Sequence, residues 1–423
     1  MVTSREVEVH SGESVEPRLV GHLRPSFTGG RSLASSSFQY ASSWLDYPGS
    51  YAISPELPLS LQRTFAPENS TLFGAIADAA PDEWGRKIID AAANRRRDGR
   101  DGPTGALGEF DYLLGVSDHT RMGALRFRDA SGGEWLTTDD EVVNIHDLDR
   151  VLAAAARYEA DEASDADIEY LSEVATSPGG ARPKANVVLE SGGLAIAKLP
   201  HSKDRGVDVE AWEAVVLDRA REAGIVVPAF DLQRASPRTS VLVSHRFDRR
   251  PDGRRRAYMS GSTVLGLGEH DGRTLSYADF ADAVGELSSD PRSDLRELFA
   301  RVCLTVLVNN TDDHWRNHGF LRRDSGWRLS PMFDVNPNPR RGGMSARALA
   351  PGGDPRERDI RDLFAQASVY GLTDEAAKTI VRRVAESVRA WPSAARSRGI
   401  ADPQFQTMAP AFSERQLDFA FGL

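Results

Sequence analysis

The stretch from residue 309 to residue 337 constrains the fold of this chain more than any other part of the sequence. It reads NNTDDHWRNHGFLRRDSGWRLSPMFDVNP and follows an apolar helical pattern that starts after Asp290, an N-cap residue followed by proline. This helical pattern runs out before Asp312, which is therefore expected in a loop. Two strand patterns, 318–322 and 327–332, flank an Asp-Ser-Gly turn. The sequence thus predicts a helix, a polar loop and a hairpin, in that order.

Three oxygen-bearing side chains fall at the ends of these elements: Asp312, Asn317 and Asp334. Phosphoryl transfer needs a carboxylate that orients and deprotonates a hydroxyl, with an amide and a second carboxylate that hold Mg²⁺ against the phosphates. The spacing Asp312-x4-Asn317 is that of a protein-kinase catalytic loop, and Asp334 follows on a hairpin, as the metal-binding aspartate of such enzymes does. By itself, the Asp-x4-Asn spacing also fits a polar, capped turn.

A second set of residues lies upstream. A glycine-containing loop (176–184), an apolar hairpin and an amphipathic helix (209–223) follow one another; Lys198 lies on the second hairpin strand, and Glu210 and Glu213 lie on the helix. Only five residues are lysine and 47 are arginine, so a lysine in an apolar strand indicates a role that arginine cannot fill. Loop amides can cover phosphates, the lysine can pair with them, and the glutamate can fix the lysine. The order of these residues favours a nucleotide site.

Composition excludes several classes of protein. A formal charge of −10 argues against a chain that grips nucleic acid by itself. The single cysteine, Cys303, allows no internal disulfide and lies in an apolar helical pattern, where we expect it to be buried. We see no apolar secretory segment at the N-terminus and no run of membrane-spanning length, so a cytoplasmic location without membrane contact is expected.

The chain is expected to divide into three parts. Residues 1–130 form an α+β subdomain, residues 131–245 carry the glycine-containing loop and Lys198, and residues 246–423 are mostly helical with the loop of Asp312. In the first part, the pattern over 72–93 predicts a helix that is interrupted at an Ala-Pro-Asp sequence. The Gly/Arg/Asp-rich residues 95–105 are expected to form a loop.

The order of these motifs resembles that of the HipA family of bacterial serine/threonine kinases, the toxins of HipBA-type toxin–antitoxin pairs. The resemblance covers nearly the whole chain. It is carried by VGHL (20–23), SPELPL (54–59), APD (80–82), RMGAL (121–125), SPGGARPK (177–184), AKLP (197–200), RFDR (246–249), TDDHWRN (311–317) and LSPMFD (329–334).

The resemblance implies an α+β, two-lobed, protein-kinase-like fold with an N-terminal accessory subdomain and a mostly helical C-terminal lobe. It implies that Asp312 is the catalytic base, that His314 supports the loop, that Asn317 and Asp334 bind Mg²⁺, and that Lys198 binds the ATP phosphates. The further ATP-binding residues that it implies are Gly179, Gly180, Ala181, Glu213, His245 and Phe247. Glu213 matches the family's helical glutamate better than Glu210 does.

The resemblance also implies regulation and partners. Ser177 matches the serine whose autophosphorylation displaces the phosphate loop and silences the kinase. The usual partner is a small helix-turn-helix antitoxin similar to HipB, which supplies the contact with DNA, and the family's protein substrates include aminoacyl-tRNA synthetases. Two residues depart from the family pattern: His245 replaces a glutamate, and Asp313 stands where a small residue is common.

Three other functions are consistent with some of these residues. A phosphotransferase that acts on a small molecule or a lipid needs the same ATP site. A catalytically weak protein that binds the antitoxin and acts as a corepressor needs none of it. A metal hydrolase would use Asp312, Asp313, His314 and His318, but the glutamate of H-E-x-x-H is missing and the run precedes a strand.

Overall fold

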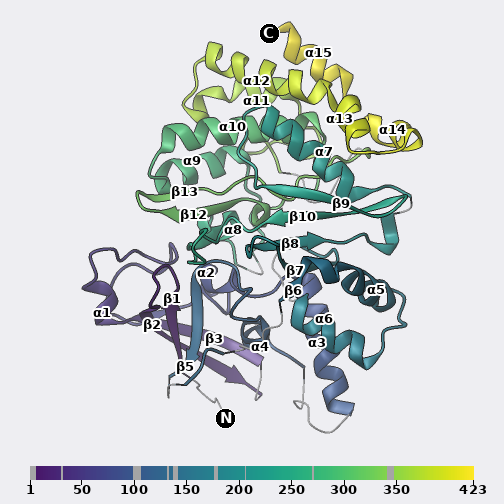
Figure 1. Cartoon of the computed structure of the whole chain (residues 1–423). Coiled ribbons are helices and arrows are strands. Elements are labelled where there is room, and N and C mark those ends of the chain that lie inside the picture. Colours follow the sequence, from purple (N-terminus) through teal and green to yellow (C-terminus); the bar gives the residue numbers. More distant parts are fainter. Residues whose placement is uncertain are drawn as a thin grey trace. The chain divides into compact units, whose positions relative to one another are not determined.

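The computed structural model of the chain describes residues 6–29, 32–98, 106–130, 133–136, 142–175, 180–204, 206–268, 271–340 and 347–423. They form two compact units (Figure 1). The first unit contains the residues up to Ser202 together with His245–Gly272, and the second contains Lys203–Ser244 together with Arg273–Leu423. The mixed fold of helices and sheets agrees with the α+β class predicted from the sequence. The three-part division of the chain stays a prediction.

The first unit begins with an antiparallel sheet, coloured mostly purple in Figure 1. Alternate side chains of its strands, among them Val7, Val9, Leu23 and Phe38, are buried in one apolar core, as expected for a sheet with one face packed. The strands pair in the order β4-β3-β2-β1-β5. Their bounds are β1 Val7–Ser11, β2 Arg18–Thr28, β3 Ser32–Tyr40, β4 Thr64–Phe65 and β5 Leu125–Asp129.

Four helices accompany this sheet: α1 Ser42–Leu45, α2 Gly74–Ala77, α3 Glu83–Asp98 and α4 Glu109–Gly115. The predicted interruption at the Ala-Pro-Asp sequence separates α2 from α3, so this prediction is confirmed. The loop predicted from residue 95 is wrong as far as residue 98, because α3 continues to Asp98. Arg95 pairs there with Asp165 and donates to the carbonyl of Ala163, 2.9 Å away, which holds the last helical turn. Residues 99–105 lie outside the described residues.

The rest of the first unit contains the predicted hairpin. Strand β7 pairs with β8 in antiparallel register, Lys184 opposite Lys198, and with β6 in parallel register. The bounds are β6 Val143–Asn144, η1 Ile145–Asp147, α5 Leu148–Glu159, α6 Asp165–Val174, β7 Lys184–Val188, β8 Leu194–Lys198, η2 Ser202–Asp204, β11 Tyr258–Ser260 and α8 Gly261–Val264. The last two residues of η2 belong to the second unit.

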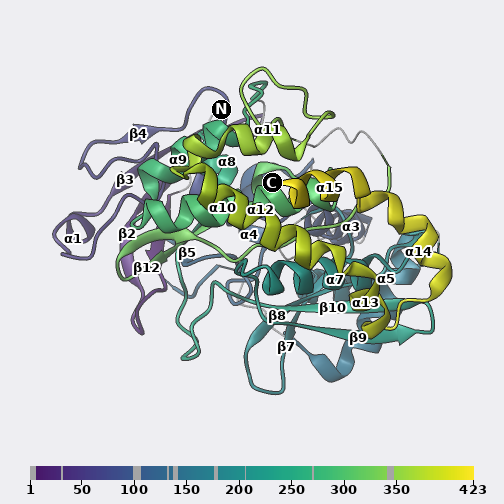
Figure 2. The ribbon, with the colours of Figure 1, turned by 90° about the horizontal axis from the view of Figure 1, so that it is seen from above.

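The second unit begins with helix α7, Val209–Glu222, and the hairpin of β9, Phe230–Ser236, and β10, Thr239–His245, whose last residue belongs to the first unit. Asp208 caps α7 by accepting a hydrogen bond from the backbone N–H of Ala211. The spacing of apolar residues after Ser276 predicts a helix over residues 277–287, and helix α9, Tyr277–Leu287, has these bounds. Helix α10, Pro291–Leu307, starts with Asp290 as its N-cap, also as predicted. Figure 2 shows α9, α10 and α12 side by side.

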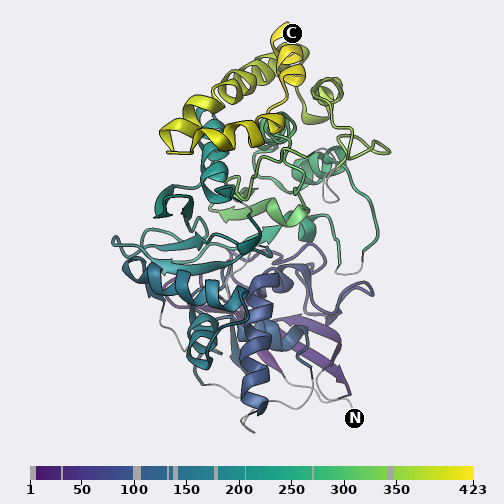
Figure 3. The same ribbon diagram turned by 90° about the vertical axis from the view of Figure 1, so that its right-hand side faces the viewer.

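The predicted hairpin after the Asp312 loop consists of β12, Gly319–Arg323, and β13, Gly326–Leu329. The second strand was expected to reach Met332, but Pro331 has no N–H, and the N–H of Met332 bonds instead to the carbonyl of Val226 at 2.8 Å. The chain ends in helices that pack on α7 and α12, coloured yellow in Figure 3. The remaining bounds are η3 Trp315–Asn317, α11 Ile360–Ala365, η4 Ala367–Tyr370, α12 Asp374–Arg389, α13 Trp391–Ser397, α14 Asp402–Met408, η5 Ala409–Ala411 and α15 Glu414–Gly422.

Two expectations about the interior can be checked directly. Cys303 on α10 is fully buried, as predicted, and burial raises the pKa of its thiol far above the usual value. Within the described ranges, no helix combines the length and the apolar character that crossing a bilayer requires.

Candidate active site

The predicted site residues fall on both units. Lys198, Gly180, Ala181, His245 and Phe247 belong to the first unit. The second unit contains the residues that were expected to bind Mg²⁺, accept the hydroxyl proton, support the catalytic loop or orient Lys198: Glu213, Asp312, His314, Asn317 and Asp334.

In the first unit, Lys184 and Lys198 are direct partners across the β7–β8 hairpin. Partners in an antiparallel pair project from the same face of a sheet, so the two lysines share a face. Their exposure differs: Lys184 is 2% exposed, whereas Lys198 is half-buried. The sequence argument singled out Lys198 and treated Lys184 only as the end of a loop.

Lys184 anchors the segment that precedes β7. Its Nζ lies 2.6 Å from Oδ2 of Asp82 and donates to the carbonyl of Gly180 at 2.9 Å. The indole Nε1 of Trp84 donates to the carbonyl of Lys184 at 3.1 Å, and the backbone N–H of Trp84 points at the carbonyl of Gly180. The start of α3 therefore holds both ends of the segment from Gly180 to Lys184.

The glycine at position 180 is required by its backbone, because its φ of +106° is unfavourable for residues with a Cβ. Ala181 follows it in the same held segment. Two other predicted residues of the phosphate loop, Ser177 and Gly179, lie outside the described residues. The sequence did not reveal the ion pair between Asp82 and Lys184, because the two residues are 102 residues apart. The one available signal was that Lys184 is one of five lysines.

The Arg-Phe-Asp-Arg motif forms a buried ionic network in the first unit. Nε and Nη2 of Arg246 lie 2.7 and 2.6 Å from the carboxylate of Asp248, and Nη1 of Arg249 lies 2.7 Å from it. The backbone N–H of Gly123 donates to the same carboxylate at 2.7 Å. Burial by itself raises the pKa of Asp248, but the two guanidinium groups outweigh burial and hold it far below the usual value. Burial also lowers the pKa of Arg249 to about 9, so both partners are charged at neutral pH.

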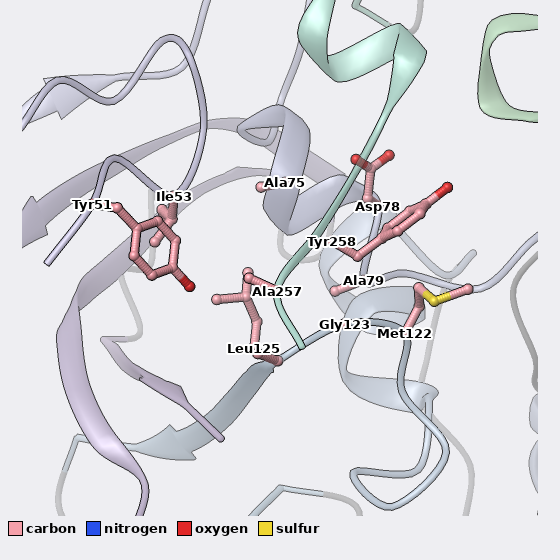
Figure 4. Close-up of a pocket in the computed structure, with 11 residues that line it drawn as sticks. Tyr51, Ile53, Ala75, Asp78, Ala79, Met122, Gly123, Leu125, Ala257 and Tyr258 are labelled. Atoms are coloured by element: carbon pink, nitrogen blue, oxygen red, sulfur yellow. The ribbon is translucent and has the colours of Figure 1, made fainter. Parts of the chain in front are cut away.

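Phe247 lies between Arg246 and Asp248 in sequence, and its ring centroid is 6.3 Å from that of Tyr258. His245 ends β10 just before it. Tyr258 also lines a small cavity together with Tyr51 and Asp78, of about 10 Å³ (Figure 4). This cavity has room for about one water molecule, so it is too small for a nucleotide.

In the second unit, the Asp-x4-Asn sequence forms a closed turn. Asp312 follows α10 with an exposed side chain, and the buried side chain of Asn317 donates from Nδ2 to the backbone carbonyl of Asp312 at 3.1 Å. The backbone N–H of Asn317 donates to the carbonyl of His314 at 2.8 Å. These bonds fix the turn and leave the Asp312 carboxylate on the outside.

Asp313 turns the opposite way. It is 3% exposed, accepts a hydrogen bond from the hydroxyl of Tyr277, and has Oδ1 3.1 Å from Nε2 of His318. The rings of Tyr277, Trp315 and His318 pack together beneath the loop. The extra carboxylate that departs from the family pattern therefore supports the loop from inside.

Asp334 lies past the hairpin on an unusual backbone. Its φ is +56°, a left-handed conformation that few residues other than glycine adopt. Such conformations cost about 1–3 kcal/mol and gather at functional sites. The segment that leads to it is fixed from α10, because Nη2 of Arg301 donates to the carbonyl of Ser330 at 2.7 Å.

The sequence analysis did not identify two arginines next to the Asp312 turn. Arg358 donates to the carbonyl of Asn310 at 2.6 Å. The guanidinium of Arg347 lies 5.4 Å from the ring centroid of Trp315. Burial lowers the pKa of both arginines, and Asp313 opposes this shift in both; for Arg347, Asp312 does so as well. Nothing in the local sequence indicated either residue, because both lie beyond the hairpin.

Two further expectations concern acidic residues and metals. Glu210 and Glu213 are both buried on α7, at 2% and 3% exposure. In the part of the chain that the structure describes, no three His, Cys, Asp or Glu side chains gather as a metal site. The hydrolase alternative of Asp312, Asp313, His314 and His318 therefore has no supporting geometry.

Comparison with known proteins decides the family. The HipA-like C-terminal domain matches residues 176–391, and the HipA N-terminal domain matches residues 14–128. The chain belongs to the HipA family. No curated protein matches it. The two domain matches confirm the family resemblance drawn from the sequence motifs.

Among solved structures, HipA of Shewanella oneidensis MR-1, in a complex of a toxin–antitoxin system with HipB and operator DNA, has a similar fold. Its TM-score is 0.68 at 18% identity, and the match covers 98% of this chain and 96% of that chain. The proinflammatory kinase CtkA of Helicobacter pylori matches with a TM-score of 0.38 at 14% identity, over 58% of this chain and 92% of that chain. The match to HipA of Shewanella oneidensis confirms the HipA-like fold predicted from the sequence.

Proposed function

We propose that this member of the HipA family is an ATP- and Mg²⁺-dependent serine/threonine protein kinase and the toxin of a toxin–antitoxin pair. The observation that supports this best is the division of labour between neighbouring aspartates. Asp313 is buried against Tyr277 and His318, while Asp312 is exposed on a turn closed by Asn317. A loop that is rigid from within and presents one carboxylate outward suits a general base.

The residues present fit Mg²⁺ and ATP by their chemistry. Mg²⁺ prefers hard oxygen ligands, which Asn317 and Asp334 would provide, and an ammonium group such as that of Lys198 pairs with phosphates. When bound, Mg·ATP supplies the γ-phosphoryl group. The backbone of Gly179, Gly180 and Ala181 would cover the phosphates, Glu213 would orient Lys198, and His245 and Phe247 would contact the nucleoside.

In this mechanism Asp312 orients a serine or threonine hydroxyl of the acceptor protein. As the hydroxyl oxygen bonds to the γ-phosphorus, the bond from that phosphorus to the β–γ bridging oxygen breaks. The hydroxyl proton passes to the Asp312 carboxylate, which His314 and the buried Asp313 hold in place through the loop. Positioning and charge stabilisation, rather than covalent chemistry, account for most of such a rate enhancement.

The proposed partners follow from the family and from charge. HipA of Shewanella oneidensis is found with HipB and operator DNA. We assign this chain a small helix-turn-helix antitoxin of the same kind, which supplies the DNA contact that a chain of charge −10 does not. The proposed substrate is a translation protein such as an aminoacyl-tRNA synthetase, in the cytoplasm.

The test uses labelled ATP with cell lysate and, separately, with a pool of small metabolites and lipids. We expect label in protein serine or threonine with the wild type and about 10³-fold slower labelling with Asp312→Asn. Asp282→Asn is the matched control, because Asp282 is an exposed aspartate on α9. Label found only in small molecules or lipids would support the alternative phosphotransferase. No label, together with antitoxin binding that survives Asp312→Asn, would support the corepressor.

Ser177 is the proposed site of autophosphorylation. A phosphate adds a charge of roughly −1.5 to −2 at neutral pH, which would repel the phosphates of ATP. Intact-mass measurement should find one added phosphate on the wild type and none on Ser177→Ala or Asp312→Asn. An unmodified wild-type protein that hydrolyses ATP would contradict this switch.

A further inference from the structure

A cavity of about 380 Å³ lies in the second unit, and no residue of the Asp312 turn lines it. Its walls come from the loop after α7, from α10, from both strands of the β12–β13 hairpin and from α12. Small-molecule sites commonly measure about 300–1,000 Å³, so the cavity is large enough for a small ligand. Its lining is rich in one residue type: Arg296, Arg301, Arg323, Arg328 and Arg383.

The cavity also contains two carboxylates, and each already has an arginine. Nη2 of Arg328 lies 2.9 Å from Asp294, which also accepts a hydrogen bond from the N–H of Leu329 at 3.0 Å. Nη2 of Arg301 lies 2.9 Å from Oε1 of Glu297. Two of the five arginines are therefore neutralised.

The other three arginines of the cavity are not neutralised by a carboxylate of the described residues. Arg296, Arg323 and Arg383 are exposed, come from α10, β12 and α12, and form no ion pair with any carboxylate in the described ranges. Three like charges around one concavity repel one another, and a concave surface of one sign concentrates counter-ions. The chain has a net charge of −10, so this local excess of positive charge is opposite in sign to the protein as a whole and favours an anionic ligand.

We propose that this cavity, which we call the arginine pocket, binds a small phosphate-bearing anion with two or more negative charges. Guanidinium groups bind phosphate oxygens through paired, charge-assisted hydrogen bonds, and arginines from three elements can surround one such group. The volume fits a pyrophosphate or a nucleotide-sized ligand better than a single phosphate.

The pocket wall is connected to the segment that carries Asp334. Arg301, whose side chain is 3% exposed, donates to the carbonyl of Ser330 as well as to Glu297. Glu297 accepts a hydrogen bond from the N–H of Val226 at 3.0 Å, and the carbonyl of Val226 accepts one from Met332 at 2.8 Å. An anion that attracts Arg301 competes with both of its acceptors. Occupation of the pocket is therefore transmitted to residues 330–334, and this second step rests on the proposed function of Asp334.

The binding step is tested by calorimetric titration with pyrophosphate at fixed ionic strength and without Mg²⁺. We expect Arg296→Ser/Arg323→Ser/Arg383→Ser to weaken binding at least tenfold. A matched triple variant of exposed arginines outside the pocket, Arg238→Ser/Arg356→Ser/Arg382→Ser, should bind like the wild type. Lys198→Ala should also bind normally, which separates the pocket from the ATP site. Because the arginines of the pocket variant are exposed, its thermal midpoint without ligand should match that of the control.

Three outcomes would overturn the inference: unchanged binding in the pocket variant, equal loss in both triple variants, or loss only in Lys198→Ala. A phosphoserine peptide that binds through the pocket arginines more tightly than pyrophosphate would overturn the assignment to a small ligand. Since the titration involves no phosphoryl transfer, a chain without kinase activity can still pass it.

The coupling step is tested by hydrogen exchange of residues 330–334 with and without pyrophosphate. We expect exchange in this segment to change in the wild type and in Lys198→Ala, and not in the pocket variant. Unchanged exchange in a protein that binds pyrophosphate would overturn the coupling.

Discussion

Charged residues are used in opposite ways in two regions of the molecule, the Arg-Phe-Asp-Arg network of the first unit and the Asp312 turn of the second. In the network, the carboxylate of Asp248 is fully buried and surrounded by Arg246, Arg249 and a backbone N–H. On the turn, the carboxylate of Asp312 is exposed and only its backbone is tied down. A carboxylate whose hydrogen bonds are all made stabilises the fold, whereas one held by its backbone alone is available for chemistry. Four predictions test this contrast.

The largest effect is expected at the turn. Asp312→Asn removes the proposed base and should lower the rate of phosphoryl transfer about 10³-fold, within the range that a general base contributes. Because the side chain is exposed, the free energy of unfolding should stay within about 0.5 kcal/mol of the wild type. Transfer from labelled ATP and urea unfolding measure the two quantities, with Asp282→Asn as control. A large loss of stability in Asp312→Asn would contradict the view that the carboxylate of Asp312, unlike that of Asp248, does not stabilise the fold.

In the Arg-Phe-Asp-Arg network, by contrast, replacing the aspartate should lower the free energy of unfolding. Asp248→Asn leaves two buried guanidinium groups without their counter-ion and should lower the free energy of unfolding by about 3–5 kcal/mol. The pKa of Asp248 is depressed in the folded state, so its contribution is present above the unfolded pKa near 4 and is lost as the pH falls below it. Urea unfolding between pH 7 and pH 3 should therefore show a shallower acid loss in Asp248→Asn than in the wild type. Equal slopes would contradict the assignment.

Lys184 and Lys198 allow the same contrast, between a charge used for folding and a charge proposed for binding, to be tested within one hairpin. Lys184→Met leaves Asp82 buried without its cation and should destabilise the first unit by about 2–3 kcal/mol. Lys198→Met should instead raise the KM for ATP at least tenfold, because its proposed partner is a phosphate group. Urea unfolding and ATP kinetics on both variants separate the two roles. A reversed pattern would mean that Lys184 is the nucleotide lysine.

The smallest effect concerns backbone strain. Asp334→Gly should raise the free energy of unfolding by about 1 kcal/mol, because glycine tolerates a φ of +56°, while abolishing Mg²⁺-dependent transfer. Asp161, exposed with a φ of +58°, is the matched control: Asp161→Gly should give a similar gain and keep full activity. A gain at Asp161 alone would show that the backbone of Asp334 is not strained.

Local sequence predicted the elements around the site because their signals are local. The Asp290-Pro291 start of α10, the bounds of α9, and the β7–β8 hairpin follow from caps, turns and spacing within about 20 residues. The loop expected over 95–98 was wrong because a tertiary contact, Arg95 with Asp165, extends the helix. Strand β13 was predicted too long because the partner of Met332 lies 106 residues away in sequence.

The sequence alone determined the family and which residues are proposed for the chemistry, since a kinase-like set of lysine, aspartate and asparagine must keep its order and spacing along the chain. Only the tertiary structure decided which charges are used for folding and which are left for binding. Asp312 and Asp313 are adjacent and chemically identical, yet one is exposed and the other is buried against Tyr277. Lys184 and Asp82, and the arginines of the pocket, meet from distant segments. Burial and the nearest partner set the state of a charged group, and neither is a property of the residue's own neighbourhood in sequence.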